Sequence, residues 1–61
     1  MLHVGMSVEE VMVMVELHLV SEEDGYAEYE SEEMVEGFSG DGMYFEFEDG
    51  SLVEYGGMAW V

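Results

Sequence analysis

The stretch MYFEFEDGSLVEY, residues 43 to 55, constrains the fold of this chain more than any other. Met43, Phe45 and Phe47 alternate with polar residues, as in a strand that buries one face. Asp49-Gly50 is a preferred dipeptide for a two-residue type I′ turn. Residues 43 to 55 are therefore predicted to form a β-hairpin with aromatic side chains on one face and carboxylates on the other.

The acidic face of this hairpin is part of a charge bias that extends over the whole chain. The 61 residues include 16 Asp and Glu but no Lys or Arg, which gives a formal charge of -16. Repulsion among these charges opposes the compact state and is screened by salt, so we expect salt to stabilise the fold. Disorder is the rival interpretation, but 49% of the residues are hydrophobic and 13% are aromatic, which favours folding.

The length predicts one small acidic domain over residues 1 to 61. Such a domain needs support from packing, salt, self-association as a homodimer or a cationic partner. We identify no apolar run of about 18 residues that would span a membrane, and no basic segment typical of a signal peptide. A cytoplasmic protein is expected, in the host cell if a phage encodes it. Direct binding to nucleic acid or to a membrane is not expected, because both are anionic.

The set of amino acids used is unusual in a second way. Ile, Thr, Asn, Gln, Pro and Cys are absent, as are Lys and Arg. Selection for one sign of charge explains the missing cations but not the other absences. Chance, an unusual coding bias and a designed origin all remain open.

Residues 11 to 20, VMVMVELHLV, fit two interpretations. Alternation with many β-branched residues favours a strand, which we prefer, with Met12, Met14, Glu16 and His18 on one face as an apolar patch rimmed by charge. A helix is the competitor, because Ser7 and Glu10 match a capping box. A helical stripe supports it, formed by Val8, Val11, Met12, Val15 and Leu19.

The other elements follow from turn and cap residues. We expect a loop at 21 to 25, a strand at 26 to 30, a short helix at 31 to 37 and a flexible link at 38 to 42. The tail at 56 to 61 is expected to add an edge strand. The predicted fold is α+β, mostly β, with a small antiparallel sheet of four or five strands and one short helix. The predicted core consists of Val13, Val15, Leu17, Leu19, Phe45, Phe47, Val53, Tyr55 and Trp60.

Catalysis and metal binding are not predicted. Carboxylates are so numerous that finding a pair carries no information, and the serines occupy positions typical of caps and turns. The turn glycines tested for a calcium loop have no acid five residues earlier; these are Gly25, Gly40, Gly42, Gly50, Gly56 and Gly57. His3 or His18 beside Glu16 is better explained as an ordinary histidine than as a zinc ligand. No cofactor is expected.

The acids fall into rows, since residues two apart on a strand share a face and lie about 6 to 7 Å apart. One predicted row contains Glu28, Glu30 and Glu32, and a second contains Glu46 and Glu48. A loop cluster contains Glu22, Glu23 and Asp24. Rows of carboxylates on a rigid sheet approximate rows of phosphates, which carry one charge per about 3.4 Å of helix axis along a DNA strand.

The chain resembles the small acidic DNA-mimicking inhibitors of bacteriophages, which include uracil-DNA glycosylase inhibitors, anti-restriction proteins and some anti-CRISPR proteins. VELHLVSEEDGYAEYE is similar to the acidic hairpin of the smaller glycosylase inhibitors, SEEMVEGF to their helix and MYFEFED to a further strand. The resemblance implies that Glu32, Glu33 and Glu36 face the DNA groove of an enzyme. It also implies that Met34 and Phe38 make an apolar contact.

Three hypotheses about function remain. The first is a non-enzymatic inhibitor that blocks the nucleic-acid-binding cleft of a basic protein. The second is a designed or composition-restricted domain without a natural target, and the third is a halophilic or cation-dependent structural module. For the first, the partner-binding residues are Glu22, Glu23, Asp24, Glu28, Glu30, Glu32, Glu33, Met34, Glu36, Phe38, Glu46 and Glu48.

Overall fold

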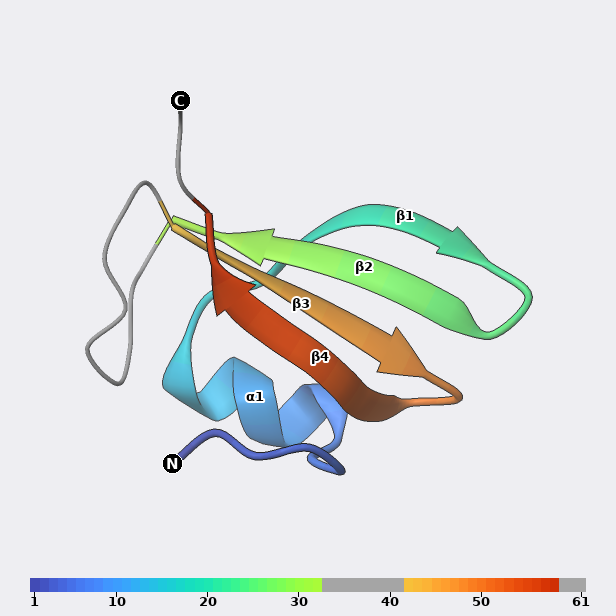
Figure 1. Ribbon diagram of the computed structural model, residues 1–61, viewed down its shortest axis with the longest axis horizontal. Coiled ribbons are helices and arrows are strands. Elements are labelled where there is room, and N and C mark those ends of the chain that lie inside the picture. The colour runs from blue at the N-terminus through green and yellow to red at the C-terminus, as the bar shows by residue number, and fades with distance from the viewer. Residues whose placement is uncertain (33–41, 59–61) are drawn as a thin grey trace.

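The hairpin predicted from residues 43 to 55 is present and forms half of a four-stranded antiparallel sheet. The computed structural model describes residues 1–32 and 42–58. In chain order the elements are α1 (Val8–Met14), β1 (His18–Glu23), β2 (Tyr26–Ser31), β3 (Met43–Glu48) and β4 (Ser51–Gly57). The strands lie in the order β1-β2-β3-β4, and α1 covers one face of the sheet (Figure 1). The predicted α+β, mostly β fold class is confirmed.

Both hairpins of the sheet turn on an Asp-Gly dipeptide. Asp49 and Gly50 have φ values of 51° and 84°, and Asp24 and Gly25 have φ values of 50° and 83°. A type I′ turn requires positive φ at both central residues, which Gly and Asp tolerate best. The loop expected at 21 to 25 is therefore shorter than predicted. Strand β1 continues to Glu23, and only the dipeptide turns.

The strand predicted over residues 11 to 20 is wrong for most of its length, because the chain forms α1 there. The Ser7 hydroxyl accepts a hydrogen bond from Glu10 N, and the Glu10 carboxylate accepts one from Ser7 N, so the capping box is complete. The bond from Ser7 N to the carboxylate, with a smaller contribution from the Ser7 side chain, lowers the pKa of the exposed Glu10. Only residues 18 to 20 are strand, as the start of β1.

A helical stripe explains which residues of this segment are buried. Val11 and Val15 are buried and Val8 is half-buried, at spacings of three and four residues. Val13 lies on the opposite side of the helix and is 87% exposed, so its predicted place in the core is wrong. Leu19 is 55% exposed, so the same prediction fails there. It lies on β1, whose six residues are all exposed.

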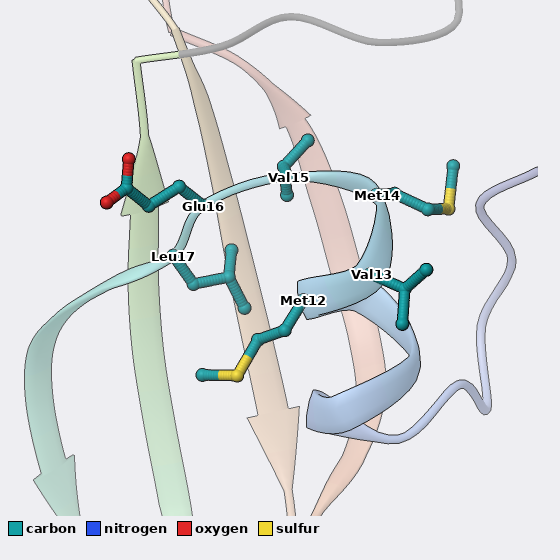
Figure 2. Close-up of a pocket in the computed structure, with 6 residues that line it drawn as sticks. All are labelled: Met12, Val13, Met14, Val15, Glu16 and Leu17. Atoms are coloured by element: carbon teal, nitrogen blue, oxygen red, sulfur yellow. The ribbon is translucent and has the colours of Figure 1, made fainter.

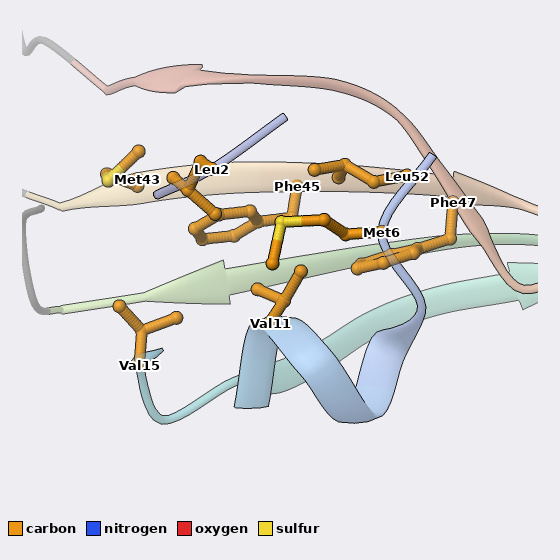
Figure 3. Close-up of a cluster of buried hydrophobic side chains, with 8 residues drawn as sticks. All are labelled: Leu2, Met6, Val11, Val15, Met43, Phe45, Phe47 and Leu52. Carbon is orange, nitrogen blue, oxygen red and sulfur yellow. The ribbon is translucent and has the colours of Figure 1, made fainter. Parts of the chain in front are cut away.

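The core lies between α1, the N-terminal segment and the sheet (Figure 3). The sheet contributes Met43, Phe45, Phe47 and Leu52, all at most 1% exposed. The burial predicted for Phe45, Phe47 and Val15 is confirmed, and Leu17 and Tyr55 pack against the cluster while partly buried. Trp60 lies outside the described residues. Leu2 and Met6 complete the core from the N-terminal segment, which the sequence analysis did not include.

A β-bulge in β4 overturns the prediction for Val53. Phe47 pairs with Leu52 and Glu46 pairs with Glu54, so Val53 has no partner in the register and is 41% exposed. The extra residue reverses the alternation beyond it. Leu52 therefore faces the core in place of Val53, while Tyr55 still points inward and donates a hydrogen bond from its hydroxyl to Leu2 O at 3.2 Å.

Two other predicted elements lie largely outside the described residues. Of the short helix expected at 31 to 37, Ser31 ends β2 and is buried, and Glu32 follows it in a bend. Of the tail expected to form an edge strand, Gly56 and Gly57 belong to β4.

Candidate acidic interface on the sheet

The face of the sheet turned away from α1 is acidic. Side chains alternate between faces along a strand, so burial of Phe45 and Phe47 against the helix directs Tyr44, Glu46 and Glu48 to the other side. Their cross-strand partners face the same way. We call this surface the outer face and define it by its acids and tyrosines, which are Tyr26, Glu28, Glu30, Tyr44, Glu46, Glu48 and Glu54.

A row of three carboxylates crosses the middle of the outer face. Glu28 of β2 lies directly opposite Glu46 of β3, and Glu46 lies directly opposite Glu54 of β4. Directly opposite residues have Cβ atoms about 4.5–5.5 Å apart, and like charges in such pairs are destabilising. The row therefore concentrates negative charge at a measurable cost to the stability of the sheet.

Two tyrosines hold carboxylates of this row in place. The Tyr26 hydroxyl donates to Glu46 Oε1, and the Tyr44 hydroxyl donates to Glu54 Oε2 at 3.0 Å. Each bond joins diagonal neighbours on adjacent strands, which long and aromatic side chains can reach. The hydrogen bond to Glu46 raises the pKa of Tyr26 to about 12, and the bond to Glu54 raises the pKa of Tyr44. In both cases the hydrogen bond favours the protonated form of the phenol.

The structure brings together five of the predicted binding residues on one side of the sheet. Glu28, Glu30, Glu46 and Glu48 share the outer face, since Glu30 pairs with Tyr44 and Glu48 pairs with Tyr26. Glu23 of β1 lies opposite Tyr26 of β2, on the side of Tyr26 away from β3, and so extends this face to β1. Glu32 is exposed beyond the end of β2.

The predicted loop cluster at residues 22 to 24 is divided between different surfaces. Glu22 pairs with the buried Ala27, so it lies on the side of the sheet that α1 covers, whereas Glu23 lies on the other side. Asp24 occupies the turn. Alternation along a strand causes this separation, because β1 extends further than the sequence predicted. Of the residues to which the resemblance assigned a contact with an enzyme, Glu32 is described and exposed. The others lie outside the described residues; these are Glu33, Met34, Glu36 and Phe38.

Sequence reasoning missed three members of the outer face. Glu54 was not assigned to a row, because its position opposite Glu46 depends on the bulge at Val53. Tyr26 and Tyr44 were not considered as partners of carboxylates. Their alternation with Glu28 and Glu46 was the available signal, since it places all four side chains on one face.

A second feature lies at the C-terminal end of α1. Residues Met12 to Leu17 line an open hollow of about 460 Å³, into which Met12 and Leu17 point toward one another (Figure 2). The sequence predicts a strand face on which Met12, Met14, Glu16 and His18 form an apolar patch rimmed by charge. That strand face is not formed, because Met12 and Met14 lie in α1 and Glu16 follows it. Met12, Met14 and Glu16 border the hollow, which His18 does not line, and the Met14 side chain points away from that of Met12 (Figure 2).

Among residues 1–32 and 42–58, no three His, Asp or Glu side chains are grouped so that they could hold a metal ion. Ser7 caps α1 and Ser51 bridges to it across the chain. In the same part of the chain, no helix has the length and apolar character needed to cross a bilayer.

The chain matches no protein-family model, no curated protein sequence and no solved structure. Inferences about function therefore depend on the geometry and charge of the outer face.

Proposed function

We propose that this protein is a non-enzymatic inhibitor that occupies the nucleic-acid-binding cleft of a basic protein with its outer face. The observation that carries this proposal is the row of Glu28, Glu46 and Glu54 on adjacent strands of a chain without Lys or Arg. Within the inhibitor, no Lys or Arg neutralises these carboxylates. A partner that grips phosphates with Lys and Arg would supply the missing charge.

The energetic cost of the row supports a binding role. Solubility requires a net charge of only about 2–8 for a small domain and is usually achieved with both signs. A sheet face exposed to water would be more stable with Thr or Lys opposite an acid. Three acids in a line are therefore better explained by recognition than by solubility.

The spacing of the acids also suits a mimic of a phosphate backbone. Neighbouring strands lie about 4.8 Å apart, and side chains on one face of a strand repeat about every 6.7 Å. The outer face thus presents a two-dimensional array of carboxylates with spacings of this size. For comparison, a single DNA strand presents one negative charge per about 3.4 Å of helix axis. The bonds from Tyr26 and Tyr44 hold Glu46 and Glu54 in this array before binding, which reduces the entropy lost on association.

The first test is to capture partners from a bacterial lysate on the immobilised protein at moderate salt and to elute them with duplex DNA. One nucleic-acid-binding protein, recovered in stoichiometric amount and displaced by DNA, is the expected result. A mixture of basic proteins that salt alone releases equally well would contradict the proposal, because it would show only a non-specific polyanion.

Paired variants then test the outer face against total charge. Replacing Glu46 and Glu48 by Gln should weaken binding of the captured partner about tenfold, or about 1.4 kcal/mol, and slow its association. The amide introduced at position 46 would still offer an oxygen to the Tyr26 hydroxyl, so the fold should persist. The control replaces Glu9 and Glu22 by Gln, which removes the same two charges from the side of the molecule that carries α1 and should change the affinity much less. Equal effects would exclude the outer face as the binding surface.

A composition-restricted domain without a natural target is the second candidate. Its support is the regularity of local structure: two Asp-Gly turns and a complete capping box. Such idealised elements are typical of designed sequences. This candidate predicts cooperative folding together with an empty DNA eluate in the capture experiment.

A further inference from the structure

The two edges of the sheet differ in what covers them. At β4, Gly5 N donates to Leu52 O and Leu52 N donates to Met6 O, both at 2.8 Å, so the N-terminal segment satisfies backbone groups of that edge. At β1, the pairing with β2 uses one side of the strand. Within residues 1–32 and 42–58, no other strand pairs with the second side (Figure 1). An antiparallel strand directs the backbone groups of alternate residues to that side, where they can bind another strand.

The side chains of β1 make this open edge partly apolar and partly acidic. All six residues of the strand are exposed. Leu19 pairs with Tyr29, whose ring packs edge-on against Phe47, so Leu19 lies on the side of the sheet that faces α1. The hollow lined by Met12 and Leu17 lies at the start of the same strand. Glu22 and Glu23 follow at the other end, on opposite faces.

Charge decides between the candidate occupants of this edge. A second copy of the chain would bring a further charge of -16 and would place Glu22 and Glu23 of both copies along one short ladder. Like charges on neighbouring strands are destabilising, and acids on an edge are a common protection against self-pairing. A basic strand would convert the same repulsion into attraction. The bulge at Val20 twists the edge and favours a short segment over a long flat one.

We propose that the free edge of β1 binds a short extended segment of a basic partner protein, which adds a fifth strand to the sheet. Backbone hydrogen bonds provide the pairing, as in other cases of strand addition. Alternation along the added strand directs one set of its side chains to Leu19 and the hollow at Met12, where apolar residues fit. The other set faces the side of Glu23, where Lys or Arg fits. This edge borders the outer face, because Ser21 lies opposite Glu28 and Glu23 lies opposite Tyr26, so an added strand would lie beside that face.

The probe is an acetylated octapeptide of alternating Lys and Val. The peptide is titrated into the full-length chain, and the chemical shifts of the protein's backbone amides are followed by nuclear magnetic resonance. We expect the largest shifts at residues 18 to 23. The control peptide has the same sequence and charge but carries N-methyl groups on alternate backbone amides of its pairing edge. It should bind at least about tenfold more weakly, because methylation removes the donors that strand addition requires. Equal binding of both peptides would overturn the proposal in favour of simple charge attraction.

Two matched variants locate the site. Val20 and Val53 are each the unpaired residue of a bulge, on β1 and β4, and are 49% and 41% exposed. Val20→Lys should weaken binding of the unmethylated peptide about tenfold, whereas Val53→Lys makes the same charge change elsewhere and should weaken it by less than about threefold. Equal weakening would overturn the proposal. The proposal would also be overturned if the unaltered protein were a dimer that did not bind the peptide and that Val20→Lys dissociated. Such a result would assign the edge of β1 to a second copy of the chain.

Discussion

The two faces of β3 show how one strand can serve opposite purposes. Met43, Phe45 and Phe47 are completely or almost completely buried against α1 and the N-terminal segment. Between them, Tyr44 and Glu46 lie on the outer face, where Glu46 sits between two further carboxylates. The inner face stabilises the fold by removing apolar surface from water. The outer face opposes folding through charge repulsion, so the core must offset its cost.

This contrast explains how a chain of charge -16 can fold at all. The repelling groups are in contact with water and ions, where interactions between charges are weak and screened. The apolar groups lie in the interior, where each buried ring contributes several kcal/mol. Separation of the two kinds of residue by strand alternation keeps the cost small and the gain large.

The largest expected effect is at the inner face. Phe45→Ala should lower the free energy of unfolding by about 3–5 kcal/mol, because it removes a fully buried ring and leaves a cavity. A chain of 61 residues has a total stability of roughly 3–9 kcal/mol, so the variant should lose between about a third and all of it. Circular dichroism during urea unfolding measures the change. A loss below about 1 kcal/mol would mean that the described core does not hold the sheet to α1.

A smaller effect of opposite sign is expected at the outer face. Glu28→Gln should raise the free energy of unfolding by about 0.2–1 kcal/mol at low salt, because it removes a like charge opposite Glu46. The gain should shrink in molar salt, where the unaltered protein itself should melt at a higher temperature. Glu22→Gln is the control, since Glu22 lies opposite Ala27 and should respond less. A melting temperature independent of salt would show that repulsion does not limit stability.

The smallest effect concerns proton binding on the outer face. The hydrogen bond to Glu46 raises the pKa of Tyr26 to about 12, above the ordinary value of 10.0 that applies in the unfolded chain. The bond therefore stabilises the fold fully below pH 10, and its contribution is lost as the pH rises towards 12. Ultraviolet absorbance of tyrosinate should show this late ionisation. The difference in absorbance between the unaltered protein and Tyr26→Phe isolates this tyrosine from the other three, and Glu46→Gln should lower its pKa. A difference that titrates near pH 10 would disprove the bond.

The sequence predicted the hairpin of β3 and β4 well, because local signals agreed. The alternation of Phe45 and Phe47 with acids and the Asp49-Gly50 turn all indicate the same structure. The same turn dipeptide at Asp24-Gly25 was overlooked, which is why β1 was predicted to end too early.

The prediction for residues 11 to 20 failed where local signals disagreed. The pattern from Val11 to Val15 suits a strand and a helix equally, and short apolar runs cannot be assigned by periodicity alone. The capping box at Ser7 and Glu10 favoured the helix. Packing of Val11 and Val15 onto the sheet stabilises it, although Val13 remains exposed as a result.

The candidate site was predictable in part for the same reason. Glu46 and Glu48 follow directly from the alternation in β3, and Glu28 and Glu30 follow from that in β2. The place of Glu54 was not predictable, because register across a bulge depends on how two strands pair. The sheet also separated Glu22 from Glu23, which the sequence had treated as one cluster.

The sequence by itself determined the charge of one sign, the Asp-Gly turns and the capping box. It also determined the alternation that divides a strand into an apolar and a polar side. All of these depend only on the identity of each residue and its near neighbours in the chain. Only the tertiary structure decided that residues 8 to 14 form a helix, that the carboxylates of β2, β3 and β4 stand in one line, and that β1 pairs on one side alone within the described residues. These features arise from contacts between segments distant in the chain. Local preferences leave several such arrangements close in free energy, and burial of Phe45, Phe47 and Leu52 against α1 selects among them.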